Sequence, residues 1–285
     1  MEEGVTFLSK GKTYHLEAER MNPYVLTAGS AGRIQKLARY LDHAECSKGD
    51  RGLVVVHGTY KGAPVSGVTT GMGPASCAIV LPEVIELIQG NGVLLRVGTA
   101  GSLQARVCPG HAVVALACIR DEDTTQALVG PEYPAVASFE MFPFLLSALG
   151  GQGFLPGKSL WLGVVHTKSD LYFKEAPQFS PKENELRERL KSYRQMGALA
   201  SEMELSAHFL LKDYYTSSRR RILSGGILGI VANAPESGRV APEEHEGLED
   251  RLLLAGLESM HTLWTTQSGE ANGCVDYYMH SISEA

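Results

Sequence analysis

The hydrophobic and polar positions of the chain follow two alternating patterns. Short apolar runs next to glycine predict buried strands at residues 24–28, 53–56, 65–69, 93–97, 112–116, 160–165 and 227–231. Longer stretches with helical spacing predict helices at residues 31–41, 76–89, 139–148, 195–214 and 242–264. Strands that alternate with helices in this way favour an α/β fold, in which helices cover both faces of a central sheet.

No internal repeat or flexible linker divides this pattern, so we expect one domain over residues 1–265 and a polar tail over residues 266–285. The tail is rich in Ser, Gly, Asn and Glu, and the stretch 212–221 is basic and polar. Both segments are predicted to lie on the surface, outside the core.

Composition and charge argue against several classes of protein. With 44% hydrophobic residues, the 285-residue chain has enough apolar side chains for a sizeable core. A net charge of -6 and a pI near 5.9 give no basic field for nucleic acid or an anionic membrane. The five cysteines are scattered without disulfide-like or metal-binding spacing, which indicates reduced thiols and no metal site. No basic leader and no run of about eighteen apolar residues occurs, so a cytoplasmic protein is expected.

Three predicted strands end in glycine turns that lead toward a helix, at residues 28–33, 69–74 and 96–101. Free backbone N–H groups converge at such turns, which makes them candidate anion sites. Arg33 and Arg96 lie at the edges of two of the turns, and Arg96 interrupts an apolar run. A guanidinium on a buried strand needs a partner, which is either a bound oxyanion or a Glu or Asp in a structural ion pair.

Two carboxylates stand near the centre of the predicted helix 195–214, in the tetrapeptide Ser-Glu-Met-Glu at 201–204. Both cannot face a dry core unless something binds them. Either one of them is solvated, or Glu204 accepts hydrogen bonds from a sugar diol while Met203 packs against the ring.

Five ordered blocks of the chain, at 29–33, 70–74, 95–104, 133–140 and 202–207, resemble the nucleoside phosphorylase superfamily, and most of all its uridine phosphorylases. The most specific pieces are Arg-Val-Gly-Thr-Ala-Gly-Ser-Leu-Gln at 96–104, Glu-Tyr-Pro-Ala-Val-Ala-Ser-Phe-Glu at 132–140 and Glu-Met-Glu at 202–204. The resemblance implies a three-layer α/β/α domain with a central mixed, partly barrel-like sheet. It also implies a pentosyltransferase that cleaves uridine, with deoxyuridine as a further candidate, to uracil and ribose 1-phosphate. Inorganic phosphate is then a co-substrate, and no cofactor is expected.

The resemblance assigns a phosphate site residue by residue. Gly29, Arg33, Arg96 and Thr99 match the positions that hold phosphate, and Arg33, Arg96 and Thr99 are therefore the expected catalytic residues. A further arginine is lent by the neighbouring subunit in this family, and the alignment places Arg51 there. Phosphate fixed beneath the sugar neutralises the developing oxocarbenium ion and then attacks the anomeric carbon.

The ribose site is assigned in the same way. Met203 and Glu204 match the ribose-binding pair, with Glu204 on the 2' and 3' hydroxyls, and His15 matches a histidine that the neighbour lends to the 5' hydroxyl. Sites that are shared between subunits imply at least a homodimer, and a higher oligomer stays open.

The base pocket is where the chain departs from its relatives. Uridine enzymes carry a Gln-x-Arg pair shortly after a Ser-Asp-x-Phe-Tyr stretch, and the sequence after 169–173 here lacks that pair. Tyr172 and Phe173 are candidates for stacking on a base, although core aromatics would have the same pattern. Gln178 is a candidate for the amide contact, and Glu202 is also assigned to the base.

Asn233 occupies the position at which the related purine enzymes place an acidic aspartate. An amide cannot protonate a purine, so Asn233 is assigned to base binding and favours a pyrimidine. The uridine enzymes follow this asparagine with an arginine, whereas Ala234 stands here.

Two alternatives remain open. The first is a purine nucleoside phosphorylase or a nucleosidase of the same fold, although the pair Arg33 and Arg96 favours phosphorolysis over hydrolysis. The second is a catalytically silent nucleoside-binding homologue, which the altered base positions would fit. A dinucleotide enzyme is disfavoured because no Gly-x-Gly-x-x-Gly fingerprint follows the first predicted strand.

Overall fold

The computed structural model describes residues 8–9, 12–233, 238–239 and 242–268. The strands of this part are β1 (Leu8–Ser9), β2 (Lys12–Thr13), β3 (Tyr24–Ala28), β4 (Asp42–Lys48), β5 (Val54–Tyr60), β6 (Ala63–Thr69), β7 (Gly92–Ser102), β8 (Ala112–Asp121), β9 (Ala135–Val136), β10 (Leu160–Lys168), β11 (Ala200–Glu202), β12 (Ile222–Asn233) and β13 (Gly238–Arg239). The helices are α1 (Ala31–Leu37), α2 (Gly73–Leu87), α3 (Met141–Gly151), α4 (Tyr172–Glu175), α5 (Glu183–Gln195), α6 (Leu205–Tyr215) and α7 (Pro242–Gln267), with 3-10 turns η1 (Ala38–Tyr40), η2 (Thr124–Ala127) and η3 (Pro177–Phe179).

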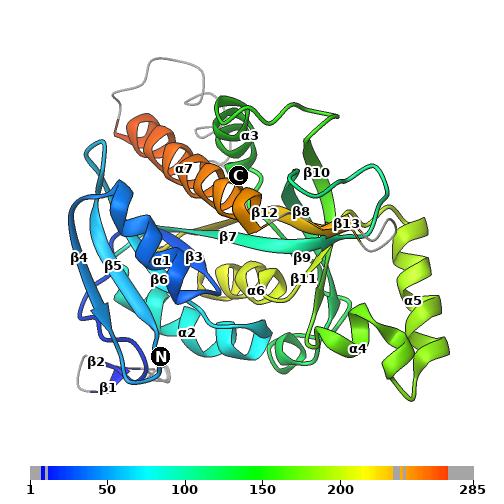
Figure 1. The fold of residues 1–285 in the computed structure, drawn as a ribbon. Helices are drawn as coiled ribbons and strands as arrows, with labels where there is room; N and C mark the ends of the chain where they lie inside the picture. The colour runs from blue at the N-terminus through cyan, green and yellow to red at the C-terminus, as the bar shows by residue number, and fades with distance from the viewer. Residues whose placement is uncertain (1–7, 10–11, 234–237, 240–241, 269–285) are drawn as a thin grey trace.

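The central sheet is mixed and closes on itself at one end. Strands β7, β12, β8, β10 and β11 pair in turn, and β11 pairs back to β7, so they form a barrel-like ring. The other end continues from β7 through β3, β6 and β5 to β4 as an open arm. The expected α/β/α fold with a partly barrel-like sheet is thus confirmed (Figure 1).

Helices cover both faces of the central strands β3 and β7 (Figure 1). Val25 and Leu94 pack with α2 on one face, whereas their neighbours Leu26 and Leu95 pack with α7 on the other. Side chains alternate between faces along a strand, so burial on both sides makes these strands apolar throughout. This explains why they were recognisable from the sequence as continuous apolar runs.

One predicted helix is wrong. Residues 195–214 do not form one helix: α5 ends at Gln195, Gly197 follows with φ of +84°, and β11 comes before α6 begins. The segment turns here because β11 closes the ring between β10 and β7, with Leu199 N–H donating to Val164 O at 2.8 Å. A buried strand of three residues next to a buried helix has no periodicity of its own, so the pattern merged the two.

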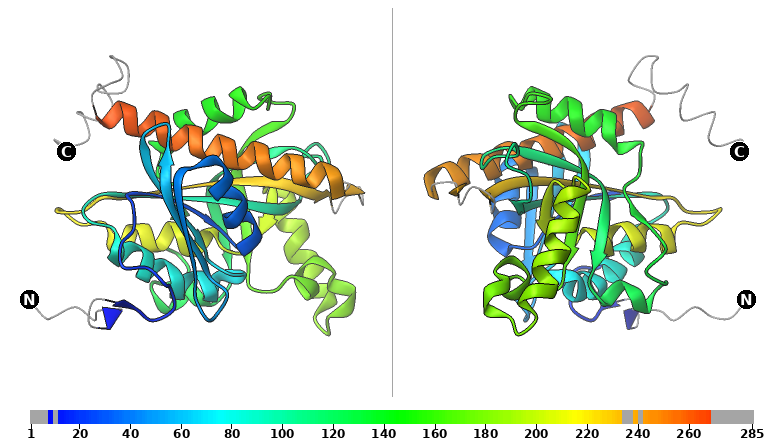
Figure 2. Two further views of the ribbon diagram at one scale, coloured as in Figure 1. Left: turned by 60° about the vertical axis from the view of Figure 1, so that its left-hand side comes forward. Right: turned by 90° about the vertical axis from the view of Figure 1, so that its right-hand side faces the viewer.

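The predicted surface segments are only partly described. Residues 212–215 complete α6, and residues 216–219 are exposed. Most of the predicted tail, including the fifth cysteine, lies outside the described residues. Helices α4 and α5, which the sequence patterns did not predict, stand out at one side of the layers (yellow-green in Figures 1 and 2). Within the described ranges, no helix has the length and apolarity needed to cross a membrane.

Candidate active site

The carboxyl ends of β3, β7, β10 and β11 surround a pocket of about 590 Å³. Ligands in open α/β folds bind at this edge of the strands, where loops and helix starts converge. Seven residues that the sequence assigned to substrate line this pocket: Gly29, Arg33, Arg96, Thr99, Glu202, Met203 and Glu204. The structure therefore brings the assigned phosphate-binding and ribose-binding residues of one subunit to the same place.

Two glycine turns approach each other at the pocket wall. A Cβ atom on Gly29 would lie 3.1 Å from the carbonyl oxygen of Gly71, which is tighter than ordinary contact. Gly71 and Gly73 have φ of +74° and +85°, values that only glycine adopts without strain. The turn aims the Gly73 N–H at the Glu204 carboxylate, which accepts its hydrogen at 2.8 Å.

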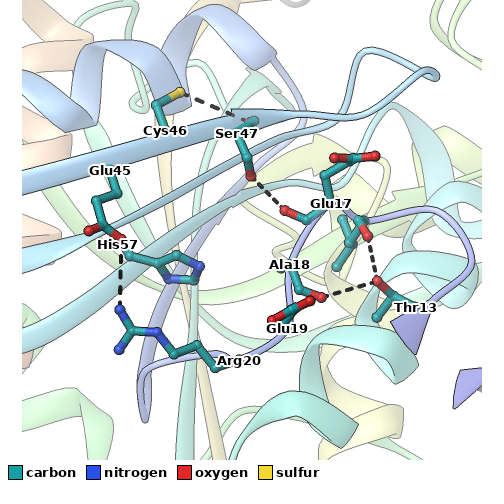
Figure 3. Close-up of a pocket in the computed structure, with 10 residues that line it drawn as sticks. Thr13, Glu17, Ala18, Glu19, Arg20, Glu45, Cys46, Ser47 and His57 are labelled. Carbon is teal, nitrogen blue, oxygen red and sulfur yellow. Dashed lines mark hydrogen bonds and ion pairs between the residues drawn. The ribbon is translucent and has the colours of Figure 1, made fainter. Parts of the chain in front are cut away.

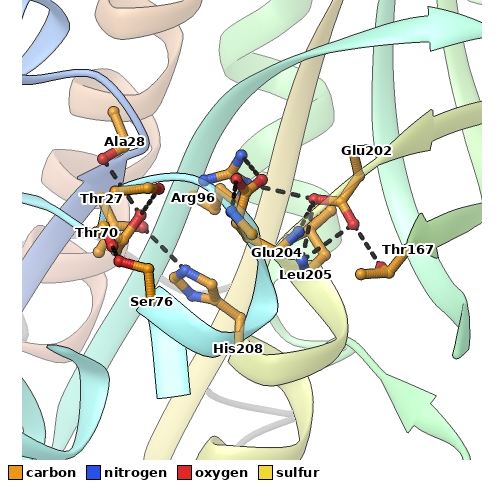
Figure 4. A network of polar contacts seen from close by, with 12 residues as sticks. Thr27, Ala28, Thr70, Ser76, Arg96, Thr167, Glu202, Glu204, Leu205 and His208 are labelled. Carbon is orange, nitrogen blue, oxygen red and sulfur yellow. Dashed lines mark hydrogen bonds and ion pairs between the residues drawn. The ribbon is translucent and has the colours of Figure 1, made fainter. Parts of the chain in front are cut away.

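Arg96 is one of the buried cations that line the pocket (Figure 4). Its Nη2 donates to Glu204, and its Nε lies 3.5 Å from Oε2 of Glu202. Burial alone would lower the pKa of Arg96, but the two carboxylates outweigh it and raise the pKa, so the guanidinium stays charged. Among the described residues, nothing accepts a hydrogen bond from its Nη1, which is buried. An anion in the pocket would supply that missing acceptor.

Glu202 ends β11 and Glu204 comes just before α6, so neither carboxylate lies within a helix (Figure 4). Glu204 is the N-cap residue, and its two carboxylate oxygens accept from Gly73 and Arg96. Glu202 accepts from the backbone N–H groups of Glu204 and Leu205 at 2.8 and 3.0 Å and from the Thr167 hydroxyl. Burial, reinforced by the charge of Glu204 and opposed by Arg96, raises the pKa of Glu202.

Arg33 reaches the pocket from α1 while held by an acidic residue of α7. Its Nε donates to Glu249 Oε1 at 3.0 Å, and its Nη1 donates to the carbonyl oxygen of Val97 at 3.2 Å. Both arginines thus have carboxylate partners and both line the pocket. The ion pairs that the sequence offered as one interpretation are therefore present, and the anion contact stays a prediction for the same side chains.

Two assigned residues, His15 and Arg51, lie away from this pocket. His15 does not line it; its Nδ1 lies 2.6 Å from Oε1 of Glu83 on α2, whose other oxygen accepts from the His15 and Leu16 N–H groups. Arg51 is an exposed residue in the turn between β4 and β5.

Most residues assigned to the base are also outside the pocket. Tyr172 and Phe173 lie on α4 with 75% and 50% of their surface exposed, and Gln178 is exposed on η3. These two aromatics are not core residues. Asn233 is buried, and its Nδ2 donates to the carbonyl oxygens of Gln104, Ala105 and Val107 at 3.2 to 3.4 Å. Ala234 lies outside the described residues.

Four polar residues that line the pocket were not assigned to substrate from the sequence: Ser30, Lys168, Glu175 and Ser201. Lys168 ends β10, and its Nζ donates to Ser201 Oγ at 2.6 Å and to Glu175. A lysine at the end of an apolar strand was the available signal, since it parallels Arg96 in β7.

A second hollow of about 450 Å³ lies between the N-terminal segment and strands β4 and β5 (Figure 3). Its charged side chains are mostly exposed, and the ion pair of Arg20 with Glu45 spans 3.8 Å between side chains that are 68% and 76% exposed. No residue that the sequence assigned to substrate lines it. Within the part of the chain that the structure describes, no cluster of three or more His, Cys, Asp or Glu is placed to hold a metal.

Comparisons with known proteins identify the family of the chain. The phosphorylase superfamily model matches residues 23–217. A uridine phosphorylase of Treponema pallidum is 32% identical over 239 residues, 83% of this chain and 86% of that protein. A DeoD-type purine nucleoside phosphorylase of a Geobacillus species is 32% identical over 203 residues, 69% of this chain and 78% of that protein. The crystal structure of a Vibrio fischeri uridine phosphorylase has the same fold, with a TM-score of 0.73 and 24% identity over 92% of this chain and all of that one.

Proposed function

Because the chain belongs to the phosphorylase superfamily and is a pentosyltransferase, we propose that it cleaves uridine with inorganic phosphate, giving uracil and ribose 1-phosphate. One observation carries the proposal: Arg96 has a buried Nη1 without an acceptor among the described residues, beside the carboxylate of Glu204 in a pocket. Phosphate is an anion that a guanidinium can bind, and the hydroxyls of ribose can donate hydrogen bonds to a carboxylate. The ion pair of Arg96 and Glu204 therefore offers one group to each co-substrate.

The proposed reaction uses few groups. Arg96, Arg33 and the Thr99 hydroxyl bind phosphate next to the Gly29 backbone, and Glu204 accepts hydrogen bonds from the 2' and 3' hydroxyls of ribose. Phosphate attacks the anomeric carbon as the glycosidic bond breaks, so the C–N electron pair leaves with the base. Stabilising the cationic sugar and the anionic base lowers the barrier. Inorganic phosphate is the only co-substrate proposed, with no cofactor and no metal.

Uridine is proposed ahead of purine nucleosides because of Asn233 and the relatives. The Asn233 amide cannot donate a proton to a leaving purine, and it is already bound to three carbonyl groups. The uridine phosphorylase relative also covers more of the chain than the purine relative does. That purine relative nevertheless makes inosine and adenosine necessary arms of the test.

We also propose that the enzyme works as a homodimer in which His15 and Arg51 complete the partner's site. Glu83 fixes Nδ1 of His15, which leaves Nε2 as the ring nitrogen available to a ribose 5' hydroxyl. The cytoplasm is the proposed location, since the buried Cys77 and Cys118 are free thiols, as is usual in reducing compartments.

The experiment measures release of free base from uridine, deoxyuridine, inosine and adenosine, with and without phosphate. We expect uracil release that requires phosphate and falls by at least about 100-fold in Arg96→Ala. Release of hypoxanthine or adenine alone would move the assignment to a purine enzyme. Base release without phosphate would indicate a nucleosidase, and no release from any nucleoside would indicate a silent binding protein.

A further inference from the structure

We propose that Lys168 and Glu175 recognise the lactam edge of the nucleobase, the neighbouring C=O and N–H groups that uracil presents. The inference rests on the proposed function, because it takes the pocket of Arg96 and Glu204 as a nucleoside site. Both residues line that pocket and neither belongs to the sequence blocks that resemble the family. They supply polar groups in a chain that lacks the Gln-x-Arg pair of its relatives.

Lys168 is placed to donate one hydrogen bond into the pocket. Its side chain is only 1% exposed, and it ends strand β10. Its ammonium group has three hydrogens, of which one goes to Ser201 Oγ at 2.6 Å and one to Oε1 of Glu175. Since Lys168 is a pocket-lining residue, the third hydrogen is available to a carbonyl oxygen of a bound base.

Glu175 is placed to accept one hydrogen bond next to that donor. It ends α4, and its carboxylate lies over β7, where a Cβ on Gly101 would come within 3.6 Å of Oε1 and 3.8 Å of Oε2. Oε1 is taken by Lys168, and no described residue donates to Oε2. The Glu175 side chain is 27% exposed, so the lysine of this ion pair is buried whereas the carboxylate is partly accessible.

A chain of buried hydrogen bonds holds the lysine in position. Ser201 Oγ lies 3.0 Å from Nδ1 of His166, and Nε2 of His166 lies 3.0 Å from Oδ2 of Asp121. If Ser201 accepts from Lys168, it donates to His166, which then donates to Asp121 as a neutral imidazole. Burial lowers the pKa of His166, in keeping with that form. Ser201, His166 and Asp121 are therefore positioning residues.

The order of residues at β11 places the pair at the base end of the pocket. Glu204 contacts the phosphate-binding Arg96, and Ser201, three positions earlier, contacts Lys168. A nucleoside with its ribose at Glu204 would therefore have its base near Ser201 and Lys168. The pocket is large enough for this, at about 590 Å³.

A neighbouring donor and acceptor select bases by their hydrogen-bonding edge. Uracil and hypoxanthine present a carbonyl oxygen to Lys168 and a ring N–H to Glu175. Cytosine and adenine present an amino group and a bare ring nitrogen, so both contacts become repulsive. Leaving buried polar groups unpaired discriminates strongly between such analogues.

The test compares kcat and KM for uridine and cytidine in the wild type, Lys168→Met and Glu175→Gln. Lys61→Met, in an exposed ion pair with Glu258, is the matched control. We expect the wild type to prefer uridine and Lys168→Met to raise the KM for uridine by about 10- to 100-fold without raising the KM for phosphate. Glu175→Gln should narrow the uridine preference by at least about tenfold, because its amide can donate to cytosine.

Two further measurements separate this inference from the proposed function and from misfolding. Lys168→Gln keeps a hydrogen-bond donor, so its KM for uridine should lie between those of the wild type and Lys168→Met. A lysine with a purely structural role would not give this order. Calorimetric binding of uracil and cytosine in the presence of phosphate needs no turnover, so it still tests the pair if no nucleoside is cleaved. Equal affinity for the two free bases, or an unchanged uridine preference in both pocket variants, would overturn the inference.

Discussion

The guanidinium of Arg96 donates to the carboxylate of Glu204, and this contact joins strand β7 to the N-cap residue of helix α6. The same carboxylate accepts the N–H of Gly73 at 2.8 Å at the start of α2. Three elements that are far apart in the sequence therefore meet at one ion pair. In the proposed reaction the cation serves phosphate and the anion serves ribose, so the pair aligns the two co-substrates.

Substitutions of the two partners should affect different co-substrates. Glu204→Gln removes a charged acceptor from the ribose hydroxyls, so we expect a rise of about 10- to 100-fold in the KM for uridine. Arg96→Lys keeps a positive charge but loses the planar guanidinium that can bind phosphate through two hydrogen bonds. In this variant the KM for phosphate should therefore rise more than the KM for uridine. Steady-state kinetics with each co-substrate varied in turn measures both effects. Equal effects of both variants on both KM values would show that the pair acts only as a structural contact.

Mixing two defective protomers should restore activity if the site is shared between subunits. His15→Ala and Arg96→Ala protomers, co-refolded in equal amounts, give heterodimers in which one of the two sites has both residues intact. About a quarter of the wild-type activity is expected from random pairing. The control mixes Glu204→Ala with Arg96→Ala, which lie in the same pocket and should not complement each other. If the first mixture is no more active than this control, His15 does not act across the interface.

The turn at Gly71 should tolerate no side chain. Its φ is +74°, and an added Cβ would collide with Ser76 Oγ, which is itself hydrogen-bonded to Thr70 O at 2.6 Å. Gly71→Ala should destabilise the fold by about 2–3 kcal/mol, combining left-handed strain with the clash. Gly90→Ala is the control, because its φ is +78° and nothing lies within 4 Å of the added Cβ. Denaturant unfolding should show a clearly smaller loss for Gly90→Ala, of about 1–2 kcal/mol, and a similar loss in both would exclude the clash.

Stability should fall as the pH falls below about 6.5, the usual pKa of histidine. Burial, with a smaller effect of the nearby Arg96, places the pKa of His208 well below its ordinary value. The folded state thus holds His208 neutral while the unfolded chain takes up a proton, so stability present above pH 6.5 is lost toward acid. The loss from one such group approaches about 1.4 kcal/mol per pH unit.

Melting temperatures of the wild type and His208→Asn between pH 8 and pH 5 check this effect. The variant removes the titrating ring, so its melting temperature should change less over the acid part of the range. His166, whose pKa burial also lowers, remains in both proteins and sets a common residual slope. Parallel curves for the two proteins would show that His208 does not contribute to acid unfolding.

The central strands and half of the site followed from the sequence because local physics determines them. Strands such as β3 and β7 are buried on both faces and read as unbroken apolar runs. Arg96 was recognisable because a charge within such a run needs a partner. The glycine turns that carry Gly29 and Thr99 were recognisable from the residues themselves, and the resemblance then assigned these two residues to phosphate.

The end of the pocket at Lys168 and Glu175 did not follow from the sequence, because its residues depend on long-range pairing. Strand β11 exists only between its partners in the closed ring, so the helix expected over 195–214 concealed where Ser201 and Glu202 lie. Lys168 and Glu175 meet across a strand end and a short helix, a contact that spacing alone cannot predict. The roles proposed for His15 and Arg51 require a second subunit, which the pattern of a single chain does not reveal.

The most direct test of the account identifies the sugar product. Uridine and phosphate are incubated with the enzyme, and phosphorus NMR follows inorganic phosphate while uracil is measured in the same sample. If the reaction is phosphorolysis, ribose 1-phosphate appears in equal amount to uracil as phosphate disappears. Uracil together with free ribose and unchanged phosphate would contradict it, because Arg33, Arg96 and Thr99 would then not hold the attacking group.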